Sequence, residues 1–334
     1  MENIIKPIKM AQYGTKHGHA SGVLQVMLEN PDVEVVGVYE PDSTRRKELE
    51  TSNTGPWTSI KWLDDKSEIL DDPSIVAVSS EGLNAESLAH TEQLVDAGKH
   101  VFYDKPAGDD YRHFERVVAK AKEQNLLIQL GYMFRYHDGF TRISEWARSG
   151  FLGQVFAIRA HMSTTISPEA QKTVAVHKGG TFYDLAGHVL DQIIWILGKP
   201  EKVTSFMRRD VSQLGTFTDN SLAVFEYDSA MATIDIAAME PSPTARRFEV
   251  YGDRGSAIME PFEPANTLRL CLVEACGSYP TGVSIVKLED RRRYVASLEA
   301  FLSNLVGEKP PDRSLEHELL VQETLLRATG RIPS

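Results

Sequence analysis

Cysteine is nearly absent from this sequence, which has only Cys271 and Cys276 among its 334 residues. Their spacing matches no usual zinc or redox motif, so we interpret them as reduced thiols of a cytoplasmic protein. No apolar run approaches the roughly 18 residues that a membrane span requires. The N-terminus lacks the basic segment and apolar core of a signal peptide. These absences predict a cytoplasmic protein with no membrane partner.

Positive charge is also scarce, because 36 lysines and arginines face 47 acidic residues and leave a net charge of -11. An acidic surface disfavours non-specific binding to nucleic acid, so we expect none as a partner. Hydrophobic residues make up 42% of the chain and charged residues 25%, as in an ordinary globular protein. The length indicates about two domains.

Short β-rich runs alternate with helical patterns in the first third of the chain. The predicted strands cover 8–13, 33–39, 75–79, 100–103 and 126–130, and the predicted helices 21–28, 43–50, 87–97 and 111–124. Strict alternation implies βαβ units, which form a parallel sheet with helices on both faces. The sequence therefore predicts a Rossmann-type α/β domain at 1–131, with ligands at the carboxyl ends of its strands.

The pattern changes after about Gly131. Helices are predicted at 139–148, 181–197 and 315–328, and strands at 203–208, 221–227, 230–238, 247–251 and 257–259, after one that ends at His161. Several of these strands follow one another without helices between them. We therefore predict an α+β domain with a large, mostly antiparallel sheet at 132–334, whose last helix could return to the first domain.

The turn after the first predicted strand has the position of a phosphate-binding turn. Glycine lets the backbone approach a pyrophosphate, and the following helix supplies free N–H groups. The glycine fingerprint is broken, since Lys16 and His19 occupy its second and third glycine positions, and an ordinary turn is an equal alternative. The cofactor-binding residues predicted here are Gly14, Thr15, Lys16, His17, Gly18 and His19.

Glu40 ends the second predicted strand, about 20 residues beyond the turn. A carboxylate there accepts hydrogen bonds from the adenosine ribose and repels a 2′-phosphate. It favours NAD over NADP, although Arg45 and Arg46 could reach such a phosphate. The alternative is that Glu40 only precedes the turn at Pro41.

Four segments resemble the Gfo/Idh/MocA oxidoreductase family, named for glucose–fructose oxidoreductase and inositol dehydrogenase. Residues 97–106 (Ala-Gly-Lys-His-Val-Phe-Tyr-Asp-Lys-Pro) resemble its AGKHVxxEKP segment, and residues 179–191 its GGxxxDxGxHxxD segment. Residues 131–136 resemble the end of its fifth strand, and residues 316–327 its returning helix. The broken glycine turn, Asp104 in place of glutamate, and Ser87 near the place of a frequent histidine depart from the family.

The resemblance implies that Lys105, Asp184 and His188 form the catalytic group. His188 is predicted to be the acid/base, Lys105 to polarise and position the substrate, and Asp184 to orient the histidine or contact a second hydroxyl. Asp184 and His188 lie four residues apart, so they share a helix face. Lys105 and Pro106, which the family often joins by a cis bond, are also expected beside the cofactor. The alternatives are a surface lysine and a helical ion pair.

The other predicted substrate contacts are Arg135, His161 and Tyr183, beside Lys105, Asp184 and His188, and each could instead be structural. His177, in the loop before the long helix, could likewise contact a substrate hydroxyl or be structural. We predict no metal on the long helix, because Asp184, His188 and Asp191 would spread over about 10.5 Å, too far for one ion.

The resemblance implies an NAD(P)-dependent dehydrogenase or reductase that acts on a secondary alcohol or ketone of a sugar, inositol or polyol. The second domain would then bind substrate and form a homodimer or homotetramer by covering its sheet. One alternative is a redox-neutral enzyme that uses NAD to cleave glycosidic bonds. Another is a non-enzymatic dinucleotide sensor, against which the retained acid/base residues argue.

Overall fold

The computed structural model describes residues 7–333, which form two compact units. The first unit joins the chain up to Gly131 to Arg292–Leu319, and the second joins Tyr132–Arg291 to the residues from Leu320 onward. No helix among the described residues is long and apolar enough to cross a membrane. The assignment of the second unit to substrate binding and oligomerisation stays a prediction.

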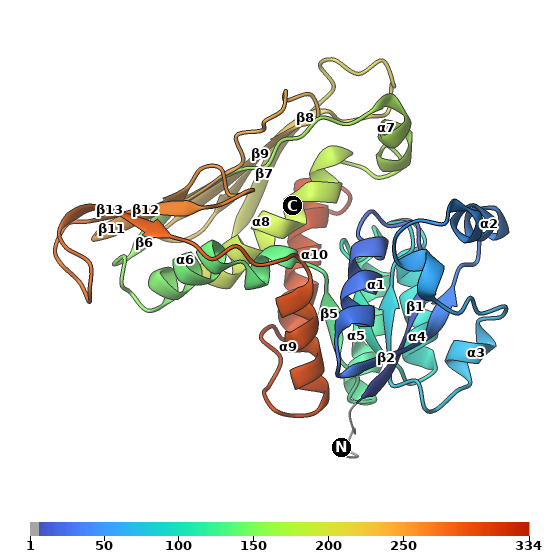
Figure 1. Ribbon diagram of the computed structural model, residues 1–334. Coiled ribbons are helices and arrows are strands. Elements are labelled where there is room, and N and C mark those ends of the chain that lie inside the picture. The colour runs from blue at the N-terminus through green and yellow to red at the C-terminus, as the bar shows by residue number, and fades with distance from the viewer. Residues whose placement is uncertain (1–6, 334) are drawn as a thin grey trace. The chain divides into compact units, whose positions relative to one another are not determined.

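The first unit contains a five-stranded parallel sheet in the order β2-β1-β3-β4-β5 (Figure 1). Its strands are β1 (Ile8–Tyr13), β2 (Val33–Tyr39), β3 (Ala77–Ser80), β4 (His100–Tyr103) and β5 (Ile128–Leu130). Its helices are α1 (Ala20–Glu29), α2 (Ser43–Ser52), α3 (Ser67–Leu70), α4 (Ser87–Asp96), α5 (Tyr111–Glu123) and α9 (Val295–Leu305). Beyond β2, a parallel bridge between Val38 and Trp62 continues the sheet by one residue pair. The predicted Rossmann architecture is confirmed.

Apolar side chains from α1, β1 and β4 form one core of this unit together with α9. Met10, Val23, Phe102 and Phe301 are all buried in it, and the rings of Phe102 and Phe301 meet edge to face. The sequence analysis did not predict α9. This helix comes from the far end of the chain and supplies apolar cover that α1 does not provide alone.

The second unit contains an eight-stranded sheet in the order β13-β12-β11-β10-β6-β9-β8-β7. Its strands are β6 (Val155–His161), β7 (Lys202–Arg208), β8 (Asn220–Glu226), β9 (Met231–Ala237), β10 (Arg247–Gly252), β11 (Gly255–Met259), β12 (Thr267–Leu272) and β13 (Gly282–Lys287). All neighbours pair antiparallel except β6 and β9. The predicted, mostly antiparallel sheet is confirmed, although β12 and β13 had not been predicted.

Helices cover one face of this sheet, and its other face is largely uncovered. α6 (Asp138–Arg148) and α8 (Thr181–Leu197) pack against β10 and β9, whereas α7 (Pro168–Val174) buries none of its residues. α10 (Leu315–Ala328) begins in the first unit and continues in the second. The apolar residues Ala232, Ile234 and Ile236 of β9 are buried, and β9 packs against α8. Intervening residues face the other way, because side chains alternate along a strand.

Candidate functional site

The turn between β1 and α1 has a backbone that only glycine fits at its first position. Gly14 has a φ of +86°, and a Cβ added to it would stand 2.8 Å from the backbone nitrogen of Gly82. Since β1 and β3 are neighbours in the sheet, the turns that follow them come close together. At Gly18, by contrast, an added Cβ would meet nothing within 4 Å. The turn thus keeps one of its glycines for a steric reason.

Glu40 lies directly after β2, with 4% of its surface exposed. Its Oε2 accepts a hydrogen bond from Thr15 Oγ1 at 2.6 Å, and its Oε1 accepts one from the backbone of Asp42 at 2.9 Å. These bonds hold a carboxylate beside the glycine turn, where ribose hydroxyls bind in dinucleotide sites. Arg46 is engaged with Leu63 O and Asp64. The turn and Glu40 together fit a dinucleotide.

Lys16, at the second glycine position, bridges two acidic side chains. Its Nζ lies 3.0 Å from Asp42 Oδ2 and 3.2 Å from Glu86 Oε1. This lysine therefore ties the turn to the residues that follow β2 and to those that precede α4.

His17 and His19 converge on the carboxylate of Asp104, at the end of β4. Asp104 Oδ2 lies 2.5 Å from His17 Nδ1 and 3.0 Å from His19 Nδ1. Burial opposes ionisation of Asp104, but the two imidazoles outweigh it and hold the pKa of Asp104 well below its usual range. Burial also lowers the pKa of His19. The sequence analysis placed both histidines at the cofactor but did not foresee their contact with Asp104.

Glu81, directly after β3, is a second buried carboxyl beside Asp104. It is 0% exposed and accepts a hydrogen bond from Ser79 Oγ at 2.8 Å. Burial, reinforced by the negative charge of Asp104, raises the pKa of Glu81 well above its ordinary range. The sequence analysis missed this residue. A signal was present, because an acidic residue directly after a predicted buried strand is unusual for a core position.

Lys105 follows Asp104, is 3% exposed, and is joined to Pro106 by a cis peptide bond, as the resemblance had suggested. Lys105 belongs to the first unit, whereas Asp184 and His188 belong to the second. The grouping of these three residues into one catalytic centre therefore stays a prediction.

His188 lies in α8 and is 1% exposed. Its ring centroid is 5.4 Å from that of Phe134 and 6.1 Å from that of Tyr132. A Cβ on the preceding residue, Gly187, would stand 2.8 Å from the Tyr132 ring, so the glycine allows this close approach. Asp184 occupies the first turn of the same helix, one turn from His188. The helix thus presents a carboxylate and an imidazole at the predicted spacing.

Arg135 forms a buried ion pair with Asp191. Its Nη2 and Nε donate to Asp191 Oδ1 at 2.7 and 3.0 Å, and the two side chains are 1% and 0% exposed. The guanidinium also lies over the Tyr132 ring, 5.0 Å from its centroid. This pair connects the segment after β5 to α8, and it lies next to Tyr132, whose ring borders His188.

His161 and Tyr183 lie in different environments. His161 is on the sheet face opposite the buried residues of β6, between the carboxylates of Asp235 and Glu240. Tyr183 is fully buried in α8, and its ring stacks on that of His177 at a centroid distance of 4.4 Å. The predicted substrate contacts of both residues stay predictions.

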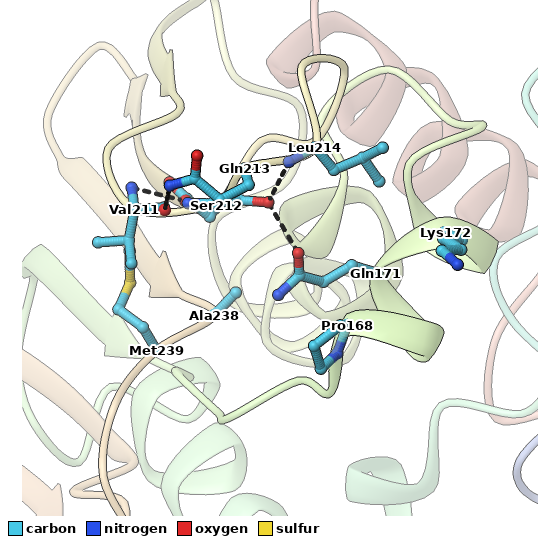
Figure 2. A pocket seen from close by; sticks show the side chains of 10 residues that line it. Pro168, Gln171, Lys172, Val211, Ser212, Gln213, Leu214, Ala238 and Met239 are labelled. Carbon is cyan, nitrogen blue, oxygen red and sulfur yellow. Dashed lines mark hydrogen bonds between the residues drawn. The ribbon is translucent and has the colours of Figure 1, made fainter.

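A separate cavity of about 440 Å³ lies in the second unit, between α7 and the loop that joins β7 to β8 (Figure 2). Ser212 Oγ donates to Gln171 Oε1 at 2.7 Å, and the carboxylate of Asp219 accepts from the backbone of three loop residues. The lining residues are Pro168, Gln171, Lys172, Val211, Ser212, Gln213, Leu214, Asp219, Ala238 and Met239. None of these is a predicted catalytic residue.

Comparison with known families agrees with this arrangement. Residues 12–132 match the oxidoreductase family with an NAD-binding Rossmann fold, and residues 140–258 match the GFO/IDH/MocA C-terminal domain. The two matches together cover most of the chain. The protein therefore belongs to the Gfo/Idh/MocA family, and it is an oxidoreductase with an NAD-binding domain.

Two curated relatives are inositol dehydrogenases. The chain is 23% identical to myo-inositol 2-dehydrogenase of Thermotoga maritima over 74% of each chain. It is 28% identical to scyllo-inositol 2-dehydrogenase (NAD⁺) of Bacillus subtilis over 59% of this chain and 58% of the relative. A solved oxidoreductase from Agrobacterium radiobacter, in complex with NAD⁺, L-tartaric acid and magnesium, has the same fold. Its TM-score is 0.82 at 14% identity, with 97% of this chain and 96% of that chain covered.

Proposed function

We propose that the protein is an NAD-dependent dehydrogenase that acts on a secondary alcohol, or on the corresponding ketone, of a sugar, inositol or polyol. The observation that carries the proposal is the pairing of Asp184 and His188 on α8, with His188 buried between aromatic rings. The inositol dehydrogenases among its relatives support the substrate class.

Bound NAD would supply the acceptor for the hydride that leaves the alcohol carbon. Gly14, the start of α1 and Glu40 are the groups of this chain that would hold it. His188 would take the hydroxyl proton during oxidation and return it during reduction. Lys105 would hydrogen-bond the reacting oxygen, and Asp184 would orient the imidazole or contact a neighbouring hydroxyl.

Glu40 supports NAD rather than NADP as the working cofactor. The carboxylate is fixed by Thr15 and by the backbone of Asp42, so it could not swing away from a 2′-phosphate without losing both bonds. A buried carboxylate facing a phosphate would be repelled strongly. We expect a marked preference for NAD.

For Arg135 we propose a positioning role in place of a direct substrate contact. Its bidentate pair with Asp191 fixes the segment that carries Tyr132 and Phe134. Those two rings border His188, so the ion pair would set the orientation of the imidazole.

We also propose that the uncovered face of the eight-stranded sheet is the contact between copies of this chain. Phe206 and Leu222 are direct cross-strand partners and are 57% and 37% exposed. Ile285, at 63%, adds an apolar side chain near the other end of the sheet. Large exposed apolar side chains on one face are typical of interfaces. Phe206→Glu should lower the oligomer mass in light scattering, whereas Val176→Glu, outside the sheet, should not.

The first experiment follows absorbance at 340 nm with NAD and with NADP against a panel of inositols, sugars and polyols. We expect turnover with NAD, and a fall of about 10² or more in kcat for His188→Ala. NAD affinity, measured by calorimetry, should be unchanged in the variant. Unchanged turnover in His188→Ala would contradict the assignment of the base.

A further inference from the structure

We propose that His17, His19 and Asp104 form a binding site for a divalent transition-metal ion such as Zn²⁺. One ring nitrogen of each histidine and one carboxylate oxygen lie within 4.8 Å of one another. They come from the turn after β1, from the residue that precedes α1, and from the end of β4. Two imidazoles and a carboxylate are ligands that zinc, iron, cobalt and nickel share. Unlike Asp184, His188 and Asp191, which are spread along α8, these three residues follow β1 and β4, the two strands that flank β3 in the parallel sheet.

The contact between His17 and Asp104 requires a proton or another cation between its two atoms. His17 Nδ1 lies 2.5 Å from Asp104 Oδ2, and it accepts the backbone N–H of His19 at 3.2 Å when it carries no proton. A protonated imidazole would supply the cation as in an ordinary ion pair, and a metal ion in its place would bind both atoms. The metal-bound form would give up the backbone contact at 3.2 Å.

Asp104 is oriented as a metal ligand would need to be. Its Oδ1 accepts the backbone N–H of Lys105 at 2.7 Å, and His19 Nδ1 lies 3.1 Å from Oδ1 and 3.0 Å from Oδ2. The residue is 3% exposed, so its remaining oxygen cannot be satisfied by bulk water. Outer hydrogen bonds of this kind commonly orient the ligands of metal sites.

Glu81 provides a second buried carboxyl beside the first. Its Oε2 is buried and has no hydrogen-bond partner, whereas Oε1 accepts from Ser79. Glu81 is not among the three residues whose ligand atoms lie within 4.8 Å of one another, so the proposed site consists of His17, His19 and Asp104 alone.

The separation of His19 Nδ1 and Asp104 Oδ2 suits two adjacent positions of an octahedron. Ligand atoms about 2.1 Å from a metal and at right angles to one another lie about 3.0 Å apart. His19 Nδ1 and Asp104 Oδ2 are 3.0 Å apart, whereas His17 Nδ1 would have to withdraw by about 0.5 Å. This arrangement leaves positions open for water or another ligand. Metal binding is a property of the chain alone, so the inference does not depend on the proposed dehydrogenase activity.

The test measures metal bound by the full chain, purified without a histidine tag and stripped with a chelator. Zn²⁺ and Co²⁺ are the probes, with equilibrium dialysis and elemental analysis for stoichiometry and visible absorption for the Co²⁺ form. We expect one equivalent of bound metal in the wild type. Asp104→Asn and His19→Asn should each weaken binding by at least about tenfold to a hundredfold, the range that loss of an outer-shell partner already costs. His113→Asn is the matched control, since His113 in α5 also contacts a single carboxylate, that of Glu92.

Circular dichroism of each metal-free variant separates loss of the site from loss of the fold. His19→Asn, whose side chain is 17% exposed, is the variant that should fold most readily. The proposal is overturned if the wild type retains no metal after dialysis. It is equally overturned if folded His19→Asn and Asp104→Asn bind as tightly as the wild type, or if His113→Asn loses as much binding as they do.

Discussion

The two units hold their predicted site residues by different means. In the first unit, ionisable side chains follow the ends of β1, β2, β3 and β4, and their mutual contacts fix them. In the second unit, His188 stands in a regular helix and is bordered by the rings of Tyr132 and Phe134. A site built from strand ends should respond most to changes of backbone conformation and charge. A site carried by a packed helix should respond most to changes of volume and of buried partners.

The largest expected effect comes from breaking the ion pair beneath the second site. Asp191→Ala leaves the buried guanidinium of Arg135 without its carboxylate partner. Removal of one member of a buried pair costs about 3–5 kcal/mol. We expect the free energy of unfolding, measured by urea denaturation, to fall by an amount in that range.

A double variant separates charge from packing at this position. Arg135→Met combined with Asp191→Leu removes both charges and keeps apolar volume, which is often close to neutral for stability. It should recover most of the stability lost in Asp191→Ala while still lowering turnover. A double variant as unstable as the single one would show that the geometry of the pair, not its charge balance, stabilises the unit.

The next effect tests the backbone of the first site. Gly14→Ala forces a side chain into a φ of +86° and against the backbone of Gly82. We expect a loss of about 1–3 kcal/mol in stability, because a non-glycine residue in such a conformation is strained. NAD affinity, measured by calorimetry, should fall about tenfold with it. Gly18→Ala is the control, since an added Cβ there meets nothing within 4 Å, and equal losses in both variants would refute the steric argument.

The regular elements of both units could be predicted because their patterns are local. The bounds of α8 and α10 coincide with the predicted 181–197 and 315–328, and α8 ends at Gly198, whose φ is +79°. The strands β12 and β13 were missed. Val283 and Ile285 are exposed apolar residues of β13, so the alternation of hydrophobic and polar residues does not mark its buried face. In β12, by contrast, the buried Leu268, Leu270 and Leu272 alternate with more exposed residues, so its local pattern was present and was overlooked.

Among the site residues too, those marked by a local pattern could be predicted and those brought together by long-range contacts could not. Gly14 and Glu40 could be placed from the rule that ligands meet the carboxyl ends of parallel strands. Asp184 and His188 could be placed from helical spacing. The contacts among His17, Glu81 and Asp104 could not, because these residues become neighbours only through the order in which β1, β3 and β4 pair. The ion pair of Arg135 with Asp191 was missed for a similar reason.

A smaller effect is expected when side-chain volume is added beside His188. Gly187→Ala would place a methyl group 2.8 Å from the Tyr132 ring, which must shift and disturb the border of His188. The ring belongs to a side chain, so we expect a stability loss of only about 1 kcal/mol. Turnover should fall about tenfold while NAD affinity stays unchanged. Equal falls in turnover and NAD affinity would contradict an effect confined to the border of His188.

The smallest effect concerns His161, which lies between two carboxylates of the second unit. The pKa of His161 is raised by its hydrogen bond to Asp235, against the opposing effect of burial and with a further contribution from Glu240. A histidine whose folded pKa is raised stabilises the protein fully below the unfolded pKa of about 6.5. That stabilisation is lost as the pH rises through the higher folded pKa.

His161→Gln should therefore lower the free energy of unfolding at about pH 6 and have no such effect at about pH 9. Asp235 is 47% exposed, so solvent screens the pair and we expect a difference of about 1 kcal/mol or less. Urea denaturation of both proteins across this range measures it. If the difference in unfolding free energy between the two proteins grew with pH, the folded protein would instead hold His161 as a neutral ring. The expected result would show that carboxylates hold His161 in place, as Asp104 holds the histidines of the first unit's turn. The stabilisation is smaller at His161 because Asp235 is exposed to solvent.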